Sequence, residues 1–225
     1  IQINDLSAKK KDIKVTGGVV FDFRDKLKFA TSLNVDINND AKLHLNIKGD
    51  SKKLSYELKS NKKIQDTWYS IDLFDIDPRA KYWFYDAMTL SSLSIQSVNG
   101  WLVYENIDKA YLNLHAKAVA NDLVYTYDKK VAPVRTSHTN LEFKDGVLFI
   151  KPQNAYSYDF FLDKSWLKID FSKKEEILTL YLLFKGQANK DLLSLLSRYK
   201  IKLHFIQKKR DFKANITIVV KQKSS

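Results

Sequence analysis

Eleven consecutive residues, 27–37, alternate without interruption between positions with apolar side chains and positions with polar or small ones. Successive side chains of a β-strand point to opposite faces of a sheet, whereas an α-helix returns to the same face about every 3.6 residues. The alternation therefore predicts a strand that is longer than average and has one apolar and one polar face. The fold of this chain must provide a place for that apolar face.

Neighbouring segments repeat the pattern. A similar run extends over 13–23, a polar turn follows at 38–40, and alternation resumes over 43–47 and, after a second turn at 49–51, over 54–58. Four consecutive strands of this kind predict an antiparallel sheet with one apolar face and one face rich in Lys, Asn and Ser. Ten in-phase apolar positions form its stripe, which we name the N-terminal stripe: Leu27, Phe29, Leu33, Val35, Leu43, Leu45, Ile47, Leu54, Tyr56 and Leu58.

Downstream, two breaks in the strand pattern predict helices. Asp77 and Pro78 are typical of a helix start, and the segment 78–90 has an apolar face at helical spacing. Asn189 can cap a second helix over 190–199. Strands are expected at 101–104, 110–118, 123–127, 156–162, 166–171, 177–184, 201–206 and 212–220. A hairpin is expected at 141–150, with strand residues Leu141, Phe143 and 147–150 on either side of a turn at 144–146 that contains Asp145-Gly146. The predicted class is all-β and mostly antiparallel, with two short helices near 78–90 and 190–199.

Length and composition indicate one domain. The chain has 225 residues but only six Gly and three Pro, which leaves no stretch typical of a flexible linker. We expect a single elongated β domain over 1–225, with 1–77 and 78–225 as candidate sub-segments. The first residues, Ile1 to Asp5, include neither an initiator Met nor a signal peptide, which is typical of a mature chain or of a fragment of a longer one.

The chain is basic, with a formal net charge of +12 and a pI near 9.5. Such a charge favours acidic partners, either nucleic acid or anionic lipid head groups, although Lys at every solvent-facing strand position would produce the same value. A single-strand binder needs aromatic side chains on its basic face for base stacking. Phe29 and Tyr56 instead fall in line with Leu, away from Lys, so no nucleic-acid partner is expected.

Motifs of common enzymes are absent from the sequence. It contains no Cys, no Gly-x-Ser-x-Gly elbow, no P-loop and no Gly-x-Gly-x-x-Gly, and its acidic clusters at 36–40 and 72–77 lack the spacing of a calcium loop. The four histidines are too scattered to suggest a metal site: His44, His115, His138 and His204. We therefore predict no enzymatic activity, no cofactor and no metal.

The order of several segments has a parallel in a known group of proteins. A Pro-started helix containing Trp83-Phe84 leads into a strand that ends at Gly100, and related segments follow in order at 98–101, 118–127, 131–135, 141–150, 152–155 and 167–171. This succession, which covers a little under half of the chain, resembles the AsmA-like superfamily, including AsmA, TamB and YhdP. None of the segments is a catalytic signature.

The resemblance implies a curled, taco-like β-sheet of the bridge-like lipid-transfer type, whose apolar groove is open along its length and holds phospholipid acyl chains. It also implies a periplasmic location, with an inner-membrane anchor and membrane contact supplied by segments outside this chain. There the protein would help phospholipid transfer between the inner and outer membranes or outer-membrane biogenesis, with cell-envelope proteins as partners. The N-terminal stripe would then line the groove.

The residues themselves leave a second interpretation open. A second sheet or the helices could cover the stripe and turn it into the closed core of a β-sandwich. Such a domain would serve as a structural or protein-interaction module that docks a partner through its basic face or an exposed strand edge. The sequence alone does not distinguish an open groove from a closed core.

Overall fold

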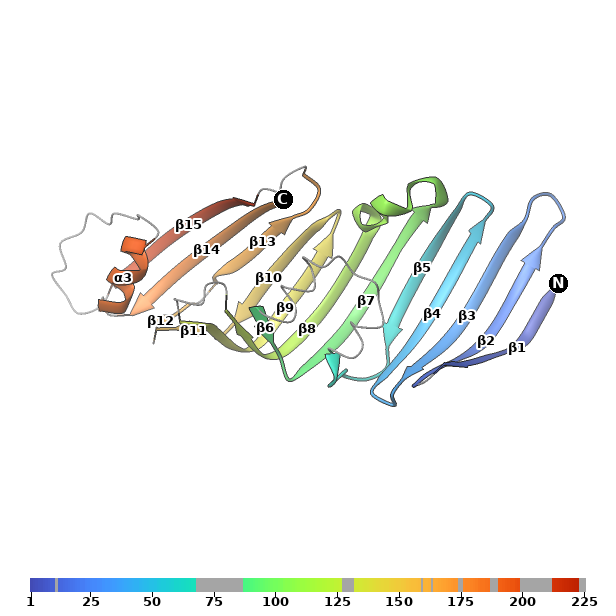
Figure 1. Ribbon diagram of the computed structural model, residues 1–225, viewed down its shortest axis with the longest axis horizontal. Helices are drawn as coiled ribbons and strands as arrows, with labels where there is room; N and C mark the ends of the chain where they lie inside the picture. Colours follow the sequence, from blue (N-terminus) through green and yellow to red (C-terminus); the bar gives the residue numbers. More distant parts are fainter. Residues whose placement is uncertain are drawn as a thin grey trace.

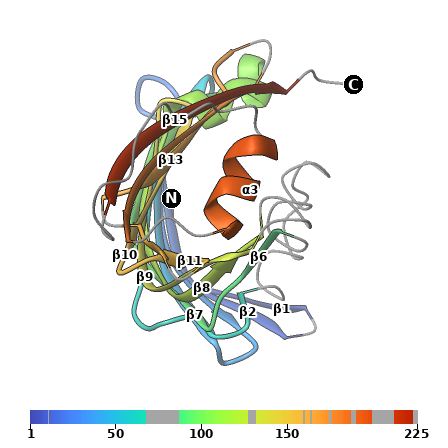
Figure 2. The same cartoon turned by 90° about the vertical axis from the view of Figure 1, so that its left-hand side faces the viewer.

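A computed structural model describes residues 1–10, 12–67, 87–126, 132–158, 160–162, 164–173, 176–186, 190–198 and 212–222. In Figure 1 the strands lie side by side along the long axis of the molecule, and Figure 2 shows that the sheet is curled, with α3 (Lys190–Arg198) on its concave side. All described strand pairings are antiparallel and belong to one fifteen-stranded sheet. The prediction of a mostly antiparallel, curled β-sheet is therefore confirmed.

The first part of the chain forms a meander of long strands. These are β1 (Gln2–Lys10), β2 (Ile13–Asp22), β3 (Lys28–Ile37), β4 (Ala41–Asp50), β5 (Lys53–Ser60), β6 (Met88–Thr89), β7 (Ser92–Val103) and β8 (Leu114–Tyr125). A 3-10 helical segment, η2 (Tyr104–Asn113), connects β7 and β8.

The second part has shorter strands and a less regular order. These are β9 (Val134–Lys144), β10 (Val147–Gln153), β11 (Tyr156–Ser157), β12 (Phe160–Phe161), β13 (Trp166–Asp170), β14 (Glu176–Gly186) and β15 (Phe212–Gln222). Neighbours in the sheet follow the order β1-β2-β3-β4-β5-β7-β8-β9-β10-β13-β14, and β15 pairs with the outer side of β14.

Two hairpin turns explain how the sequence sets the register of the long strands. Asn38 and Asn39 adopt positive φ angles of 51° and 56° between β3 and β4, and Asp145 and Gly146 do so, at 52° and 75°, between β9 and β10. Asn, Asp and Gly tolerate this left-handed conformation better than other residues. Asp145 and Gly146 form a two-residue hairpin loop, whose twist this conformation matches, whereas the β3–β4 loop has three residues, 38–40, because Ile37 pairs with Ala41. Both turns were predicted from the sequence, and both are confirmed.

A closed circuit of strand pairs distinguishes the C-terminal part. The short hairpin of β11 and β12 pairs with β9 through Tyr156 and Arg135, and with β14 through Phe161 and Lys185. Because β9, β10, β13 and β14 are also paired in sequence, six strands form a hydrogen-bonded ring. Phe160 and Leu162, at this hairpin, are among the most deeply buried side chains of the described chain. The first five strands form no such ring.

The main core cluster lies on one face of this C-terminal part. Met88 of β6 packs with Leu123, Ile150, Leu167 and Ile169, all of them buried. β6 reaches this position by pairing with the end of β8, Met88 opposite Tyr125. Since Figure 2 shows β6 and α3 on the concave side, the apolar face of the sheet is the concave one.

Several sequence-based predictions need correction. Residues 78–86 of the helix expected at 78–90 lie outside the described residues. Met88 and Thr89, near its described end, form strand β6 because they pair with β8. Residues 110–113, expected as strand, are 3-10 helical, and the strand expected at 156–162 is the short β11–β12 hairpin. The strand expected at 201–206 lies outside the described residues. The helix expected at 190–199 is confirmed as α3.

Candidate apolar binding face

One row of cross-strand partners crosses almost the whole sheet. Directly paired residues lie on the same face, so the register places eleven positions, ten apolar side chains and one glycine, in a single line. We name this line the apolar row: Leu6, Gly17, Leu33, Leu45, Leu58, Val98, Ala116, Phe143, Leu148, Ile169 and Leu178. At about 4.8 Å between neighbouring strands it extends over roughly 50 Å.

Burial along the apolar row changes from one end to the other. Leu6, in the edge strand β1, is exposed, and Leu33, Leu45 and Leu58 are only half-buried. Ile169, near the other end, is 5% exposed and belongs to the main core cluster. The other positions of the row, from Val98 onward, are half-buried like Leu33. The same apolar face is therefore partly accessible over most of the sheet and buried around Ile150, Leu167 and Ile169 of β10 and β13.

The structure brings nine of the ten residues of the N-terminal stripe onto this face. They occupy in-phase positions of β3, β4 and β5, paired across the strands as the alternation predicted. Leu27 is the exception, because it precedes β3 in the loop after β2 and is exposed. Leu43 is the most buried of the ten, since it packs with Ile37, Ala41 and Ile64 in a second core cluster near one edge of the sheet.

Two glycines shape the surface of the stripe. A side chain at Gly49 would meet the Phe29 ring at 2.9 Å, and one at Gly100 would meet the Tyr56 hydroxyl oxygen at 2.7 Å. Each aromatic ring thus occupies the space that a neighbouring side chain would otherwise need, as is typical of aromatic–glycine pairs in sheets. Burial by these neighbours also raises the pKa of the Tyr56 hydroxyl. These positions of the apolar face are lined by flat rings.

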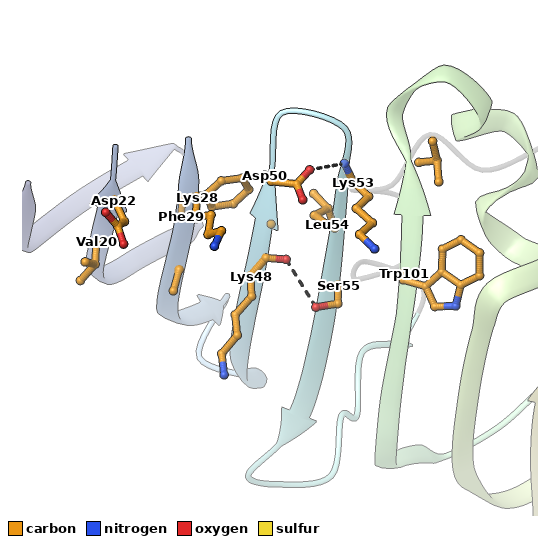
Figure 3. Close-up of a pocket in the computed structure, with 13 residues that line it drawn as sticks. Val20, Asp22, Lys28, Phe29, Lys48, Asp50, Lys53, Leu54, Ser55 and Trp101 are labelled. Carbon is orange, nitrogen blue, oxygen red and sulfur yellow. Dashed lines mark hydrogen bonds between the residues drawn. The ribbon is translucent and has the colours of Figure 1, made fainter. Parts of the chain in front are cut away.

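A pocket of about 890 Å³ lies on the opposite, outer face of β2–β5 and β7 (Figure 3). Its centre follows a second row of cross-strand partners, Val20, Ala30, Lys48, Ser55 and Trp101. This volume falls within the roughly 300–1,000 Å³ of pockets that bury small ligands. Sequence analysis missed this pocket, because alternation assigned most of its residues to a solvent-exposed face, and only Phe29 and Leu54 of the N-terminal stripe also line it.

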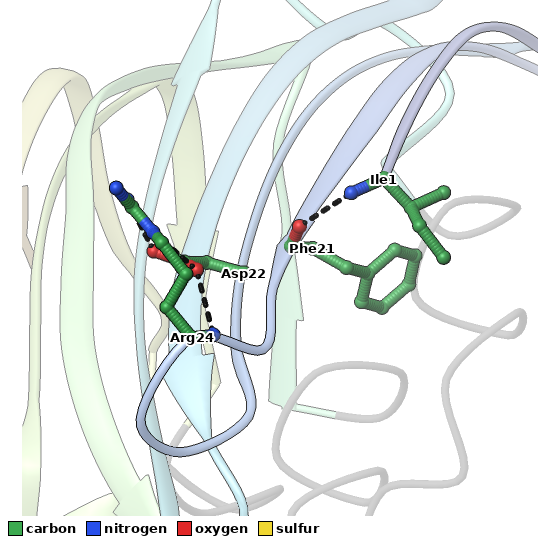
Figure 4. Close-up of polar contacts among 4 residues, drawn as sticks. All are labelled: Ile1, Phe21, Asp22 and Arg24. Atoms are coloured by element: carbon green, nitrogen blue, oxygen red, sulfur yellow. Dashed lines mark hydrogen bonds and ion pairs between the residues drawn. The ribbon is translucent and has the colours of Figure 1, made fainter.

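The two carboxylates around this outer pocket, those of Asp22 and Asp50, accept hydrogen bonds from neighbouring residues. Asp22 accepts two hydrogen bonds from the Arg24 guanidinium, at 2.8 and 3.0 Å (Figure 4), and these bonds hold the pKa of its carboxyl well below the usual range. Asp50 accepts backbone N–H bonds from Lys52 and Lys53, which lower its pKa.

In contrast, the ammonium groups of Lys28, Lys48 and Lys53 have no ion-pair partner within the described part of the chain. These three lysines line the pocket from β3, β4 and β5. The outer pocket therefore offers positive charge beside apolar surface.

The closed C-terminal part leaves little internal space. The cavity between Leu123, Ile150, Leu167 and Leu180 has a volume of about 50 Å³, far below the range of ligand pockets. This part of the apolar face is a packed core.

The described residues show no candidate metal site. They contain no group of three or more His, Asp or Glu side chains placed to hold an ion. His115 contacts Asp145 at 2.9 Å, and His44 contacts Asn34 at 3.0 Å, so both have local polar partners on the sheet surface. His204 lies outside the described residues. Over the same residues, none of the helices has the length and apolar character needed to span a bilayer.

Comparison of the chain with family models, with curated proteins and with solved structures finds no match.

Proposed function

We propose that this chain is a non-enzymatic lipid-binding module whose concave apolar face holds phospholipid acyl chains. The observation that supports this most is the apolar row, which extends over roughly 50 Å and stays only half-buried at Leu33, Leu45 and Leu58. A face of that length normally indicates an interaction site when it is not fully covered. The proposed site is a taco-like groove over β1–β8 that ends at the closed C-terminal core.

Binding of an acyl chain in the proposed groove does not require a specific contact with the protein. Each methylene moved from water to an apolar surface gains about 0.8 kcal/mol. An acyl chain lying along the apolar row would gain several kcal/mol from its methylenes alone, whatever its head group. In this proposal the protein acts at the periplasmic side of the cell envelope, anchored to the inner membrane by a segment outside this chain. It would assist phospholipid movement to the outer membrane.

Substitution on the two faces of β3 tests the proposal. Leu33 belongs to the apolar row, whereas Ser32 lies on the outer face and is exposed. We expect Leu33→Glu and Leu45→Glu to stay folded, because a half-buried carboxylate can still reach water, but to lose co-purifying phospholipid in native mass spectrometry. The matched control, Ser32→Glu, should retain both. Unchanged lipid content in folded Leu33→Glu and Leu45→Glu would exclude this face as the lipid site.

The second candidate function, docking of a partner protein, has one observation in its favour. β1 is an edge strand whose described residues are exposed throughout, and it pairs on one side only, with β2. Unpaired edge strands can accept a strand from another protein. The described residues form one sheet and not two packed sheets, so a partner would bind to this edge or to the basic outer face. A tight protein partner with no bound lipid would favour this function.

A further inference from the structure

The loops at the two ends of the strands form two long edges of the sheet, and these two edges differ in the side chains that they expose. One edge consists of the loop 23–27, the turn 50–53 and η2, and we name it the η2 edge (Figure 1). The backbone N–H of Tyr104 donates to the Lys52 carbonyl at 3.0 Å, which joins η2 to the neighbouring turn. The opposite edge includes the turn 38–40 and residues 61–67.

Large apolar side chains project from the η2 edge. Ile107 is 65% exposed and Phe23 is 57% exposed, and Leu27, Tyr104 and Tyr111 are exposed as well. All five belong to loops or to η2. Phe23 also stacks on Phe21 of β2, with 6.1 Å between the ring centroids, and the Tyr111 hydroxyl donates to the Phe171 carbonyl at 3.3 Å. Aliphatic and aromatic side chains that project from loop tips are typical of surfaces that enter the interfacial region of a lipid bilayer.

The opposite edge has a different composition. Its β3–β4 turn is Asn38-Asn39-Asp40, and residues 61–63 are Asn-Lys-Lys. Among the described residues at this edge, the exposed large apolar side chains are Tyr156 of β11 and Leu193 of α3. Exposed apolar side chains are therefore more numerous in the loops of the η2 edge.

Charge beside the η2 edge identifies the kind of membrane. The outer pocket opens about two residues from this edge, and its lysines, Lys28, Lys48 and Lys53, lack ion-pair partners among the described residues. The nearby carboxylates of Asp22 and Asp50 already accept hydrogen bonds. Lys28 and Lys53 lower the pKa values of these two carboxyl groups through their charge, without forming an ion pair with them. Ammonium groups next to an interfacial surface attract the phosphates of anionic lipids.

We propose that the η2 edge docks on an anionic lipid bilayer, with Phe23, Leu27 and Ile107 in the interfacial region and Lys28, Lys48 and Lys53 at the head-group phosphates. This contact would lie within the described chain, in addition to any anchor elsewhere. It does not depend on the concave face, so the docking and the proposed acyl-chain groove can fail separately.

Vesicle sedimentation tests the docking. The protein should bind vesicles of phosphatidylcholine with phosphatidylglycerol and bind pure phosphatidylcholine vesicles much more weakly. The double variant Phe23→Ser/Ile107→Ser should lose about tenfold or more in affinity, because these exposed side chains would no longer enter the interface. The pair Lys48→Gln/Lys53→Gln should lose at least about tenfold on anionic vesicles. Lipid co-purified in the concave face should be unchanged in both variants.

Variants at the opposite edge are the matched controls. Tyr156→Ser removes an apolar side chain that is 51% exposed, and Lys62→Gln/Lys63→Gln removes two exposed charges. Both should bind vesicles like the unaltered protein. Equal losses in these controls, or no binding of the unaltered protein to anionic vesicles, would overturn the proposal.

The absence of cysteine from the chain permits a second, direct measurement. A polarity-sensitive dye attached at Ile107→Cys should move into an apolar environment when anionic vesicles are added, and the same dye at Lys63→Cys should not. The same response at both positions would show that the η2 edge is not the docking surface.

Discussion

Strands β3–β5 and strands β10, β13 and β14 have the same kind of sequence, yet their apolar faces differ in accessibility. Leu33 and Leu45 are half-buried, whereas Leu167 and Ile169, at corresponding positions of the same face, are buried. The difference comes from what lies over the sheet: the C-terminal strands are covered by β6 and closed by the β11–β12 hairpin. Alternation sets which face is apolar, and additional short elements decide whether that face becomes a core.

The largest expected effect of a single change follows from this difference. Leu167→Glu places a carboxylate in the main core cluster, where Leu167 is 4% exposed, and should cost several kcal/mol and unfold the domain. Leu33→Glu, on the half-buried part of the same face, should leave a cooperative thermal transition. Circular dichroism during heating measures both. Equal destabilisation of the two variants would mean that the two parts of the face are equally closed.

A smaller effect is expected within one strand. Leu43 and Leu45 are two residues apart on the same face of β4, but only Leu43 belongs to a core cluster. Leu43→Ala should therefore cost about 2–5 kcal/mol, as is usual for buried leucines. Leu45→Ala should cost clearly less, since its side chain remains partly accessible. Urea denaturation of the two variants provides the comparison, and a larger loss for Leu45→Ala would contradict it.

Hydrogen exchange should show the same contrast without any substitution. Backbone amides of β10 and β13, in the middle of the closed circuit, should exchange more slowly than those of β1 and β2 at the open edge. Amide exchange followed by NMR or mass spectrometry measures the difference. Uniform protection across the sheet would show that the two parts unfold as one unit.

The smallest expected effects concern two carboxyl groups. Hydrogen bonds from Arg24 lower the pKa of Asp22; burial tends to raise the pKa of Asp170, but hydrogen bonds from Ser172 and the nearby Lys168 and Lys173 outweigh it and lower that pKa. Both carboxylates therefore contribute to stability above their ordinary pKa near 4, and that contribution is lost as pH falls through the lowered values.

Removing the side-chain donors should reduce these shifts, while the backbone N–H bonds from residues 24 and 172 remain. Arg24→Gln should raise the pKa of Asp22 toward its ordinary value, and Ser172→Ala should raise that of Asp170. Since burial of Asp170 then acts with less opposition, its final pKa should be the higher of the two. NMR titration of the carboxyl carbons measures both values. A pKa of Asp22 that stays equally low in Arg24→Gln would show that the guanidinium of Arg24 is not its main cause.

Much of the N-terminal sheet could be predicted from the sequence. Strands β2–β5 and the β3–β4 turn follow from strict alternation and from Asn38 and Asn39, because these signals are local. The turn expected at 49–51 begins later than predicted, because Gly49 and Asp50 belong to β4. Nine residues of the N-terminal stripe were therefore placed on the correct face. β1 was missed because its polar and basic residues, including Lys9 and Lys10, indicated only a charged cluster.

The C-terminal closure could not be predicted in this way. β6, β11 and β12 are two residues each, too short for any periodic signal, and they pair with strands distant in sequence. The outer pocket was missed for a related reason. Its residues lie on five strands, and only the register brings Lys48, Ser55 and Trp101 together.

The strand order determines how a duplicated copy of this unit could extend the sheet. The path β1-β2-β3-β4-β5-β7-β8-β9-β10-β13-β14-β15 contains an even number of strands, each antiparallel to the next. The first and last strands therefore run in opposite directions. A duplicated unit placed after β15 would begin with a strand antiparallel to it, in the orientation that β1 already has. Tandem duplication would thus lengthen the sheet by pure translation, whereas an odd number of strands would require every second unit to be inverted.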